Sequence, residues 1–149
     1  MLRPILVSAC LLGLATRYDG GSRPHQGVLD LLREQGLLPI PVCPEQLAGL
    51  PTPRPPVRFS HGDGKAVLDG EGLMVTADGV RMNEVFINGA QALLEVARLT
   101  GCGEALLKER SPSCGVHTVY RGEDRVEGQG VACALLRRHG VIIRSEEDL

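Results

Sequence analysis

Short apolar runs alternate with longer amphipathic segments along the whole chain of 149 residues. Residues 3–9 are almost entirely apolar, which is typical of a strand that is buried on both faces of a parallel sheet, and the apolar run at residues 37–42 predicts a second strand. Two further apolar runs, at residues 104–107 and 141–144, predict a third and a fourth strand. We therefore expect four strands that belong largely to one parallel sheet.

Three amphipathic segments between these runs predict helices. Pro24 suits the first turn of a helix whose apolar residues follow at helical spacing, and Gly36 suits its end. Residues 80–100 predict a long second helix with an apolar stripe, and residues 128–139 predict a third. Gly89 lies inside the second helix, at a cost of about 1 kcal/mol relative to alanine. A close contact with a neighbouring segment would explain that glycine.

Two stretches interrupt the alternation of strands and helices. Residues 49–56 hold four prolines, which form neither helix nor central strand and therefore predict a stiff extended loop. Residues 65–68 and 73–76, with two glycines between them, predict a small β-hairpin. Residues 116–120 predict a further short extended segment.

The order of these elements predicts an α/β fold. We expect a single-domain three-layer sandwich, residues 1–149, with a mostly parallel (Rossmann-like) sheet and a small β-hairpin. In such sheets, ligands bind beyond the carboxyl ends of the strands. Residues that directly follow the predicted strands are therefore the candidates for a functional site.

Composition excludes several classes of protein. The chain has 16 basic and 18 acidic residues and a net charge of −2, which gives no general attraction to nucleic acid or to an anionic membrane. No apolar run approaches the ~18 residues of a membrane span. The residues before Cys10 are similar to a lipoprotein cleavage box, but they are shorter than the ~7–15 apolar residues of a signal peptide. We expect a cytoplasmic protein.

Cysteine is the residue type that changes this picture most. Five cysteines at wide spacing do not form a disulfide framework, and in a reducing compartment such residues are more often ligands or catalysts. Cys10, Cys43 and Cys114 each follow a predicted strand, whereas Cys102 and Cys133 do not and are interpreted as structural. Three thiolates at one sheet edge could hold Zn²⁺ or an iron–sulfur cluster and leave one metal position open. The alternative is that they are small buried core residues.

Other polar residues near these strand ends are candidates for chemistry. Glu45 could act as a general base, although a carboxylate in a first helical turn is also favoured by the helix dipole. Ser111 and Ser113 flank Pro112 and could orient a water molecule or simply form a turn. Cations that could neutralise an anionic site, or lie on the solvated surface, are Arg17, Arg54, Lys108 and Arg110. The weaker candidates are His25 and His117.

Two rival sites fit the sequence poorly. Small phosphatases and arsenate reductases place a C-x5-R loop after the first strand, but Cys10 and Arg17 have one residue more between them and bulky leucines follow Cys10. Neither G-x-G-x-x-G after the first strand nor G-x-x-x-x-G-K-[ST] is present, so a nucleotide-binding site has little support.

Five motifs, in this order along the chain, resemble the DUF523 family, whose characterised members are thiouracil desulfidases. The motifs are Ser8-Ala9-Cys10-Leu11-Leu12-Gly13, Arg17-Tyr18-Asp19-Gly20-Gly21, Val42-Cys43-Pro44-Glu45, Gly49-Leu50-Pro51-Thr52-Pro53-Arg54-Pro55 and Ser111-Pro112-Ser113-Cys114-Gly115. The resemblance spans nearly the whole chain.

The resemblance implies a [4Fe-4S] cluster held by Cys10, Cys43 and Cys114, with the fourth iron open to the sulfur of a small thiolated pyrimidine. It further implies a non-redox reaction in which thiouracil and water give uracil and hydrogen sulfide, with Glu45 as the base and Ser111 as the residue that assists it. Candidates to surround the cluster or bind the substrate are Arg17, Asp19, Arg54, Lys108 and Ser113.

Many relatives have Cys where this chain has Thr16, and we expect that this position is not a ligand. Some relatives carry an extra domain and act on thiouridine in tRNA. Because this chain is expected to lack that domain, a free base or nucleoside is the expected substrate. A non-catalytic iron–sulfur or metal protein that senses or stores iron or sulfide is the alternative function. We expect a monomer or a homodimer.

Overall fold

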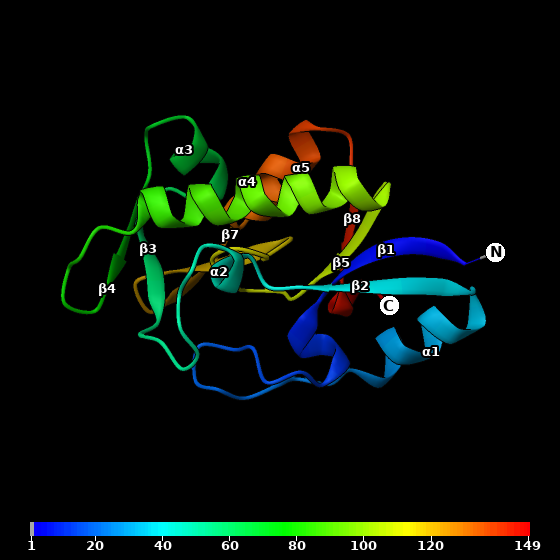
Figure 1. The fold of residues 1–149 in the computed structure, drawn as a ribbon. Coiled ribbons are helices and arrows are strands. Elements are labelled where there is room, and N and C mark those ends of the chain that lie inside the picture. Colours follow the sequence, from blue (N-terminus) through cyan, green and yellow to red (C-terminus); the bar gives the residue numbers. More distant parts are fainter. Residues whose placement is uncertain (1) are drawn as a thin grey trace.

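The computed structural model describes residues 2–149, and its first β-sheet carries the features that position the site (Figure 1). This sheet is parallel and has the strand order β2-β1-β5-β8. Its strands are β1 (Arg3–Ser8), β2 (Leu37–Val42), β5 (Glu104–Leu107) and β8 (Ile142–Ser145). All four were predicted from the apolar runs, so the expected parallel sheet is confirmed.

Helices cover both faces of this sheet. In Figure 1, α1 (Gln26–Glu34) lies below the sheet, and α4 (Asn83–Thr100) and α5 (Val131–Arg138) lie above it. Neighbouring residues of a strand point to opposite faces, so Ile5 packs with the α1 cluster and Leu6 packs with the α4 and α5 cluster. The arrangement confirms the three-layer α/β sandwich.

A second four-stranded sheet extends the structure beyond what was predicted. Its order is β4-β3-β6-β7, with antiparallel pairs at both ends and a parallel pair in the middle. Its strands are β3 (Val57–His61), β4 (Leu73–Thr76), β6 (Thr118–Arg121) and β7 (Asp124–Glu127). The small hairpin of the structure is the β6–β7 pair, joined through Gly122 at φ 60°.

The prediction of a β-hairpin from residues 65–68 and 73–76 is wrong. Residues 64–68 form a short helix, α3 (Gly64–Leu68), because the Asp63 side chain accepts a hydrogen bond from the Ala66 amide at 3.1 Å and caps the first turn. The apolar residues of α3 then pack toward α5, where Val67 is buried. β4 pairs with β3 instead, a strand that the sequence pattern did not indicate.

Gly89 has the close contact that was expected for it. A side chain at this position would overlap the Pro44 carbonyl oxygen and would lie 3.2 Å from the Ala48 side chain. The missing side chain therefore lets α4 pack directly against the short helix α2 (Pro44–Leu47), which carries Glu45. Residues 49–56 form an irregular loop, as predicted, with a turn at Gly49 and bends at Thr52 and Pro53. The Arg54 amide donates to the Tyr18 carbonyl at 2.7 Å. Among residues 2–149, no helix has the length and apolar character needed to cross a membrane.

Candidate functional site

The carboxyl ends of β1, β2 and β5 border one cleft of about 430 Å³, which we call the thiol cleft. Cys10, Cys43 and Cys114 all line it, although they come from three separate segments of the chain. Glu45 and Ser111 line it as well. The structure therefore brings together the residues that the strand-end positions had indicated.

Cys10 lies in a short 3-10 helix, η1 (Ala9–Leu12), that turns the chain directly after β1. Gly13 ends this helix with φ 95°, a backbone conformation that favours glycine. The Cys10 residue is only 8% exposed. Burial raises the pKa of the Cys10 thiol to about 11, and the charges of Lys108 and Arg17 act in the opposite direction.

Cys43 occupies the residue before α2, where Pro44 ends the ladder of β2 and begins the helix. Its sulfur lies 3.8 Å from the Thr16 carbonyl oxygen and 3.7 Å from Arg54 Nη2. Cys43 is the most exposed of the three thiols that line the cleft. Thr16 also lines the cleft, but its hydrogen bonds to the site are made through its backbone carbonyl.

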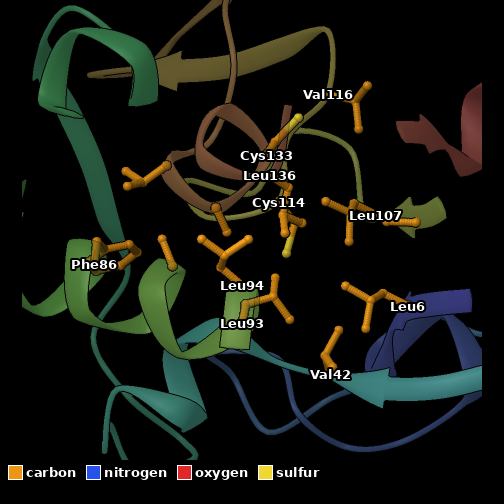
Figure 2. Packing of buried hydrophobic residues seen from close by; sticks show 14 of the residues in the cluster. Leu6, Val42, Phe86, Leu93, Leu94, Leu107, Cys114, Val116, Cys133 and Leu136 are labelled. Carbon is orange, nitrogen blue, oxygen red and sulfur yellow. The ribbon is translucent and has the colours of Figure 1, made fainter. Parts of the chain in front are cut away.

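Cys114 is held in a loop that packs against the start of α5. Ser111 Oγ accepts hydrogen bonds from the Ser113 and Cys114 amides at 3.1 and 3.0 Å. The first amides of α5 donate to the carbonyls of Pro112 and Ser113, each at 2.9 Å. Burial raises the pKa of Cys114 well above its ordinary value, and a hydrogen bond from Ser8 opposes this. Figure 2 shows Cys114 among Leu6, Val42 and Leu107, which lie near the ends of the three strands.

The walls of the thiol cleft carry an excess of positive charge. Seven basic and two acidic residues line it: Arg17, Arg23, Arg54, Arg58, Lys108, Arg110 and Arg125, against Glu45 and Glu109. Arg54, Lys108 and Arg110 form ion pairs with carboxylates. Arg17 Nη1 is buried and has no hydrogen-bond partner among residues 2–149. A buried donor without an acceptor is costly, so these walls suit an anionic group in the cleft.

Glu45 is held by a donor on each carboxylate oxygen. Arg54 Nε donates to Oε1 at 2.9 Å, and the Ser113 hydroxyl donates to Oε2 at 3.2 Å. The Glu45 side chain is 14% exposed, so it borders the cleft without lying free in solvent. Because each oxygen of a carboxylate has two lone pairs, both oxygens keep acceptor capacity for a water molecule or a substrate.

Several other predicted site residues have clear places in the structure. Ser111 lines the cleft and also forms the turn, because its oxygen accepts two amides while its O–H proton remains available to donate. Ser113 is buried and does not line the described part of the cleft, but its hydroxyl donates to Glu45. Lys108 lines the cleft, but its Nζ forms an ion pair with Glu146 at 2.9 Å. Asp19 does not line the described part of the cleft; its carboxylate accepts the Gly21 amide, which lowers the pKa of Asp19.

The remaining cysteine and histidine candidates have local structural contacts. The Thr100 hydroxyl lies 3.1 Å from the Cys102 sulfur, and Cys133 is fully buried on α5. His25 caps α1 by accepting the Val28 amide at 3.2 Å. His117 lies 2.9 Å from Asp148. None of these four side chains lines the thiol cleft as described by residues 2–149.

Sequence reasoning missed Glu109, which organises the loop of Cys114. One carboxylate oxygen accepts the amides of Val116, His117 and Thr118 at 2.8, 2.8 and 3.0 Å. Burial acts to raise the pKa of Glu109, but these backbone amides together hold it below its ordinary value. The residue lies in a charged Lys-Glu-Arg stretch that looks solvent-exposed in the sequence, so no local pattern indicated its role.

The acidic end of the chain also contributes to this loop. Glu146 pairs with Lys108, Glu147 pairs with Arg110 at 2.6 Å, and Asp148 lies beside His117. Glu146 additionally accepts the Glu109 amide at 2.8 Å. The only signal in the sequence was the opposite charge of two short stretches, 108–110 and 146–148.

Comparisons with known proteins agree on one family. The model of the 2-thiouracil desulfurase family matches residues 5–148. A curated relative, the uncharacterized protein YbbK of Bacillus subtilis (strain 168), is 37% identical over an alignment of length 148, and the match covers 97% of each chain. A solved structure named the [4Fe-4S]-dependent thiouracil desulfidase TudS is 40% identical, with a TM-score of 0.83. The match covers 99% of this chain and 93% of that one.

Proposed function

Because the chain belongs to the 2-thiouracil desulfurase family, we propose that it removes sulfur from a thiolated pyrimidine by means of a [4Fe-4S] cluster. The proposed reaction is thiouracil plus water to uracil plus hydrogen sulfide. The observation that carries this proposal is the convergence of Cys10, Cys43 and Cys114 on one cleft from three strand ends. The similarity to TudS, which is named as [4Fe-4S]-dependent, supports the choice of cluster over Zn²⁺.

The residues of the thiol cleft fit such a cluster. Cys10, Cys43 and Cys114 supply three soft sulfur ligands, which suit iron–sulfur clusters. Burial disfavours a free thiolate at Cys10 and Cys114, whereas coordination by a metal deprotonates a thiol outright. The unpartnered Arg17 Nη1 gives the anionic charge of the thiolates a nearby donor. When bound through three thiolates, the cluster supplies an open, soft Lewis-acidic iron that can polarise a thiocarbonyl group.

Within this cleft, Glu45 has the role of base. It accepts a proton from the water molecule that attacks the thiocarbonyl carbon, and Arg54 and Ser113 keep its carboxylate aimed at the cleft. The Ser111 hydroxyl lines the same cleft and donates to the water or to a ring atom. One C=S bond is replaced by a C=O bond, the sulfur leaves as hydrogen sulfide, and no electrons are exchanged.

A second candidate substrate is thiouridine in tRNA. The observation that favours it is the outer wall of the cleft, where the guanidinium carbons of Arg58 and Arg125 lie 4.4 and 6.0 Å from the ring centre of Tyr120. This local positive charge contrasts with the net charge of −2 and suits a substrate that carries phosphate. A free base would leave this wall unused.

The test uses protein purified without air and reconstituted with iron and sulfide. Loss of the thione absorbance of 4-thiouracil, together with release of sulfide, is the expected result. Cys114→Ala is expected to lose bound iron and activity together, whereas Cys102→Ala, which lies outside the cleft, should keep both. Thiolated tRNA assayed in parallel distinguishes the two substrates. Cluster-loaded protein that leaves both thiolated substrates unchanged would instead support the non-catalytic iron or sulfide protein.

A further inference from the structure

Arg54 is the most extensively hydrogen-bonded side chain at the thiol cleft. Its side chain is only 4% exposed, and all three of its guanidinium nitrogens have partners. Nη1 donates to the Thr52 hydroxyl at 2.9 Å and to the Pro51 carbonyl at 3.3 Å. These two bonds fix the guanidinium within its own proline-rich loop.

The other two nitrogens of Arg54 reach the proposed chemistry. Nε donates to Glu45 Oε1 at 2.9 Å. Nη2 donates to the Thr16 carbonyl at 2.9 Å and lies 3.7 Å from the Cys43 sulfur. One rigid planar group therefore contacts a proposed cluster ligand and the proposed base at the same time.

We propose that Arg54 is a positioning residue that holds the Cys43 sulfur and the Glu45 carboxylate at the same time, and thereby sets both the reduction potential of the cluster and the placement of the base. This inference rests on the proposed function and extends it to a residue that does not itself react. Only the arginine fork can make these bonds together, because its five N–H groups lie in one plane, whereas a lysine ammonium is a point charge on a flexible stem.

Two consequences separate this role from simple stabilisation of the loop. Hydrogen bonds to ligand sulfurs contribute to the reduction potential of an iron–sulfur cluster, and they favour its more negative, reduced form. Loss of the bond from Nη2 to Cys43 should therefore shift the potential to a more negative value. Loss of the bond from Nε to Glu45 should lower kcat more than it changes KM, because the donors of Arg54 are already occupied within the protein.

The experiment compares cluster-loaded wild type with Arg54→Lys, and uses Arg98→Lys as the matched control. Arg98 lies on the exposed face of α4, where it pairs with Glu95 away from the thiol cleft. In Arg54→Lys we expect kcat to fall by on the order of 10–100-fold, as for other residues that orient metal ligands, and the potential to become more negative. Arg98→Lys should change neither quantity.

A double-variant cycle with Glu45→Gln tests whether Arg54 affects kcat through its contact with Glu45. In the Glu45→Gln background, Arg54→Lys should cause little further loss of kcat, because the two residues act as a unit, but it should shift the potential as before. Independent, multiplicative losses of kcat would overturn the proposal. An unchanged potential in Arg54→Lys, measured by EPR-monitored titration, would overturn it as well.

Two additional measurements apply if the Arg54→Lys variant does not fold or if the wild type has no desulfidase activity. If Arg54→Lys does not fold, the Arg54 Nε–H resonance of ¹⁵N-labelled wild type should move in Glu45→Gln, and an unmoved resonance would overturn the proposal. If loaded wild type desulfurates no thiolated substrate, the proposed function fails. The potential of Arg54→Lys then still decides whether Arg54 is coupled to Cys43.

Discussion

The ends of β2 and β5 both deliver a cysteine to the thiol cleft, but they are held in place by different means. After β2, one side chain makes most of the contacts: Arg54 donates hydrogen bonds to Cys43, to Glu45 and to the proline-rich loop. After β5, the loop of Cys114 is held by many backbone bonds, to Glu109 and to the start of α5. Equivalent positions at one sheet edge are therefore fixed in two ways: by one arginine that donates to several acceptors, or by carboxylate and carbonyl oxygens that accept many backbone amides.

Because the Cys114 loop packs closely against the start of α5, we expect a large loss of stability when Gly130 is substituted. A side chain at this position would overlap the Ser113 carbonyl group and lie 2.7 Å from the Cys114 amide nitrogen. Gly130→Ala should therefore destabilise the protein by about 3 kcal/mol, the upper part of the range for overpacking. Urea unfolding of the cluster-free protein measures this, with Gly103→Ala as control because that site has open space. Equal stabilities of the two variants would show that the loop gives way easily.

Glu109 is the centre of the same network, and its removal should have the next largest effect. Glu109→Gln replaces a buried carboxylate that accepts three backbone amides, so we expect a loss of about 2 kcal/mol. The folded-state pKa of Glu109 is lowered, so its contribution is present above the unfolded value of about 4.3 and is lost as the pH falls through the folded value. The difference in urea midpoint between wild type and Glu109→Gln should therefore be smaller at pH 3 than at pH 7. A constant difference at both pH values would contradict this role.

The acidic C-terminal residues pair with the segment before Cys114 through one buried side chain, Glu146, and one exposed side chain, Glu147. The Glu146 side chain is 7% exposed and accepts both Lys108 Nζ and the Glu109 amide. Glu146→Ala should cost about 1–2 kcal/mol, because it leaves a buried amide unpaired. Glu147→Ala should change stability by less than about 0.5 kcal/mol, because the Glu147 side chain is 48% exposed. Thermal unfolding of the two variants in parallel is the measurement, and similar losses would mean that burial does not decide the effect.

A large part of the fold could be predicted from local pattern. The four parallel strands, the three long helices and the extended proline-rich loop all occur where periodicity and proline placed them. The meeting of Cys10, Cys43 and Cys114 followed from one further rule, that the carboxyl ends of parallel strands share an edge. The second sheet was not predicted as a sheet, because β7 is short and polar, and in β3 the alternation of buried Val57 and Phe59 with polar residues extends over only five residues.

The sequence by itself determined which segments are strands and which residues stand at their ends, because hydrophobic periodicity and the effects of proline and glycine act over a few residues. Tertiary structure alone decided how those ends are held. Arg54 and Thr16 are 38 residues apart, and Glu109 and Glu146 are 37 apart, so no local pattern reports their contacts. Buried charges must find partners wherever the fold supplies them. Only the folded chain brings Arg54 and Glu109 to the thiol cleft and the acidic C-terminal turn to the Lys108–Arg110 stretch.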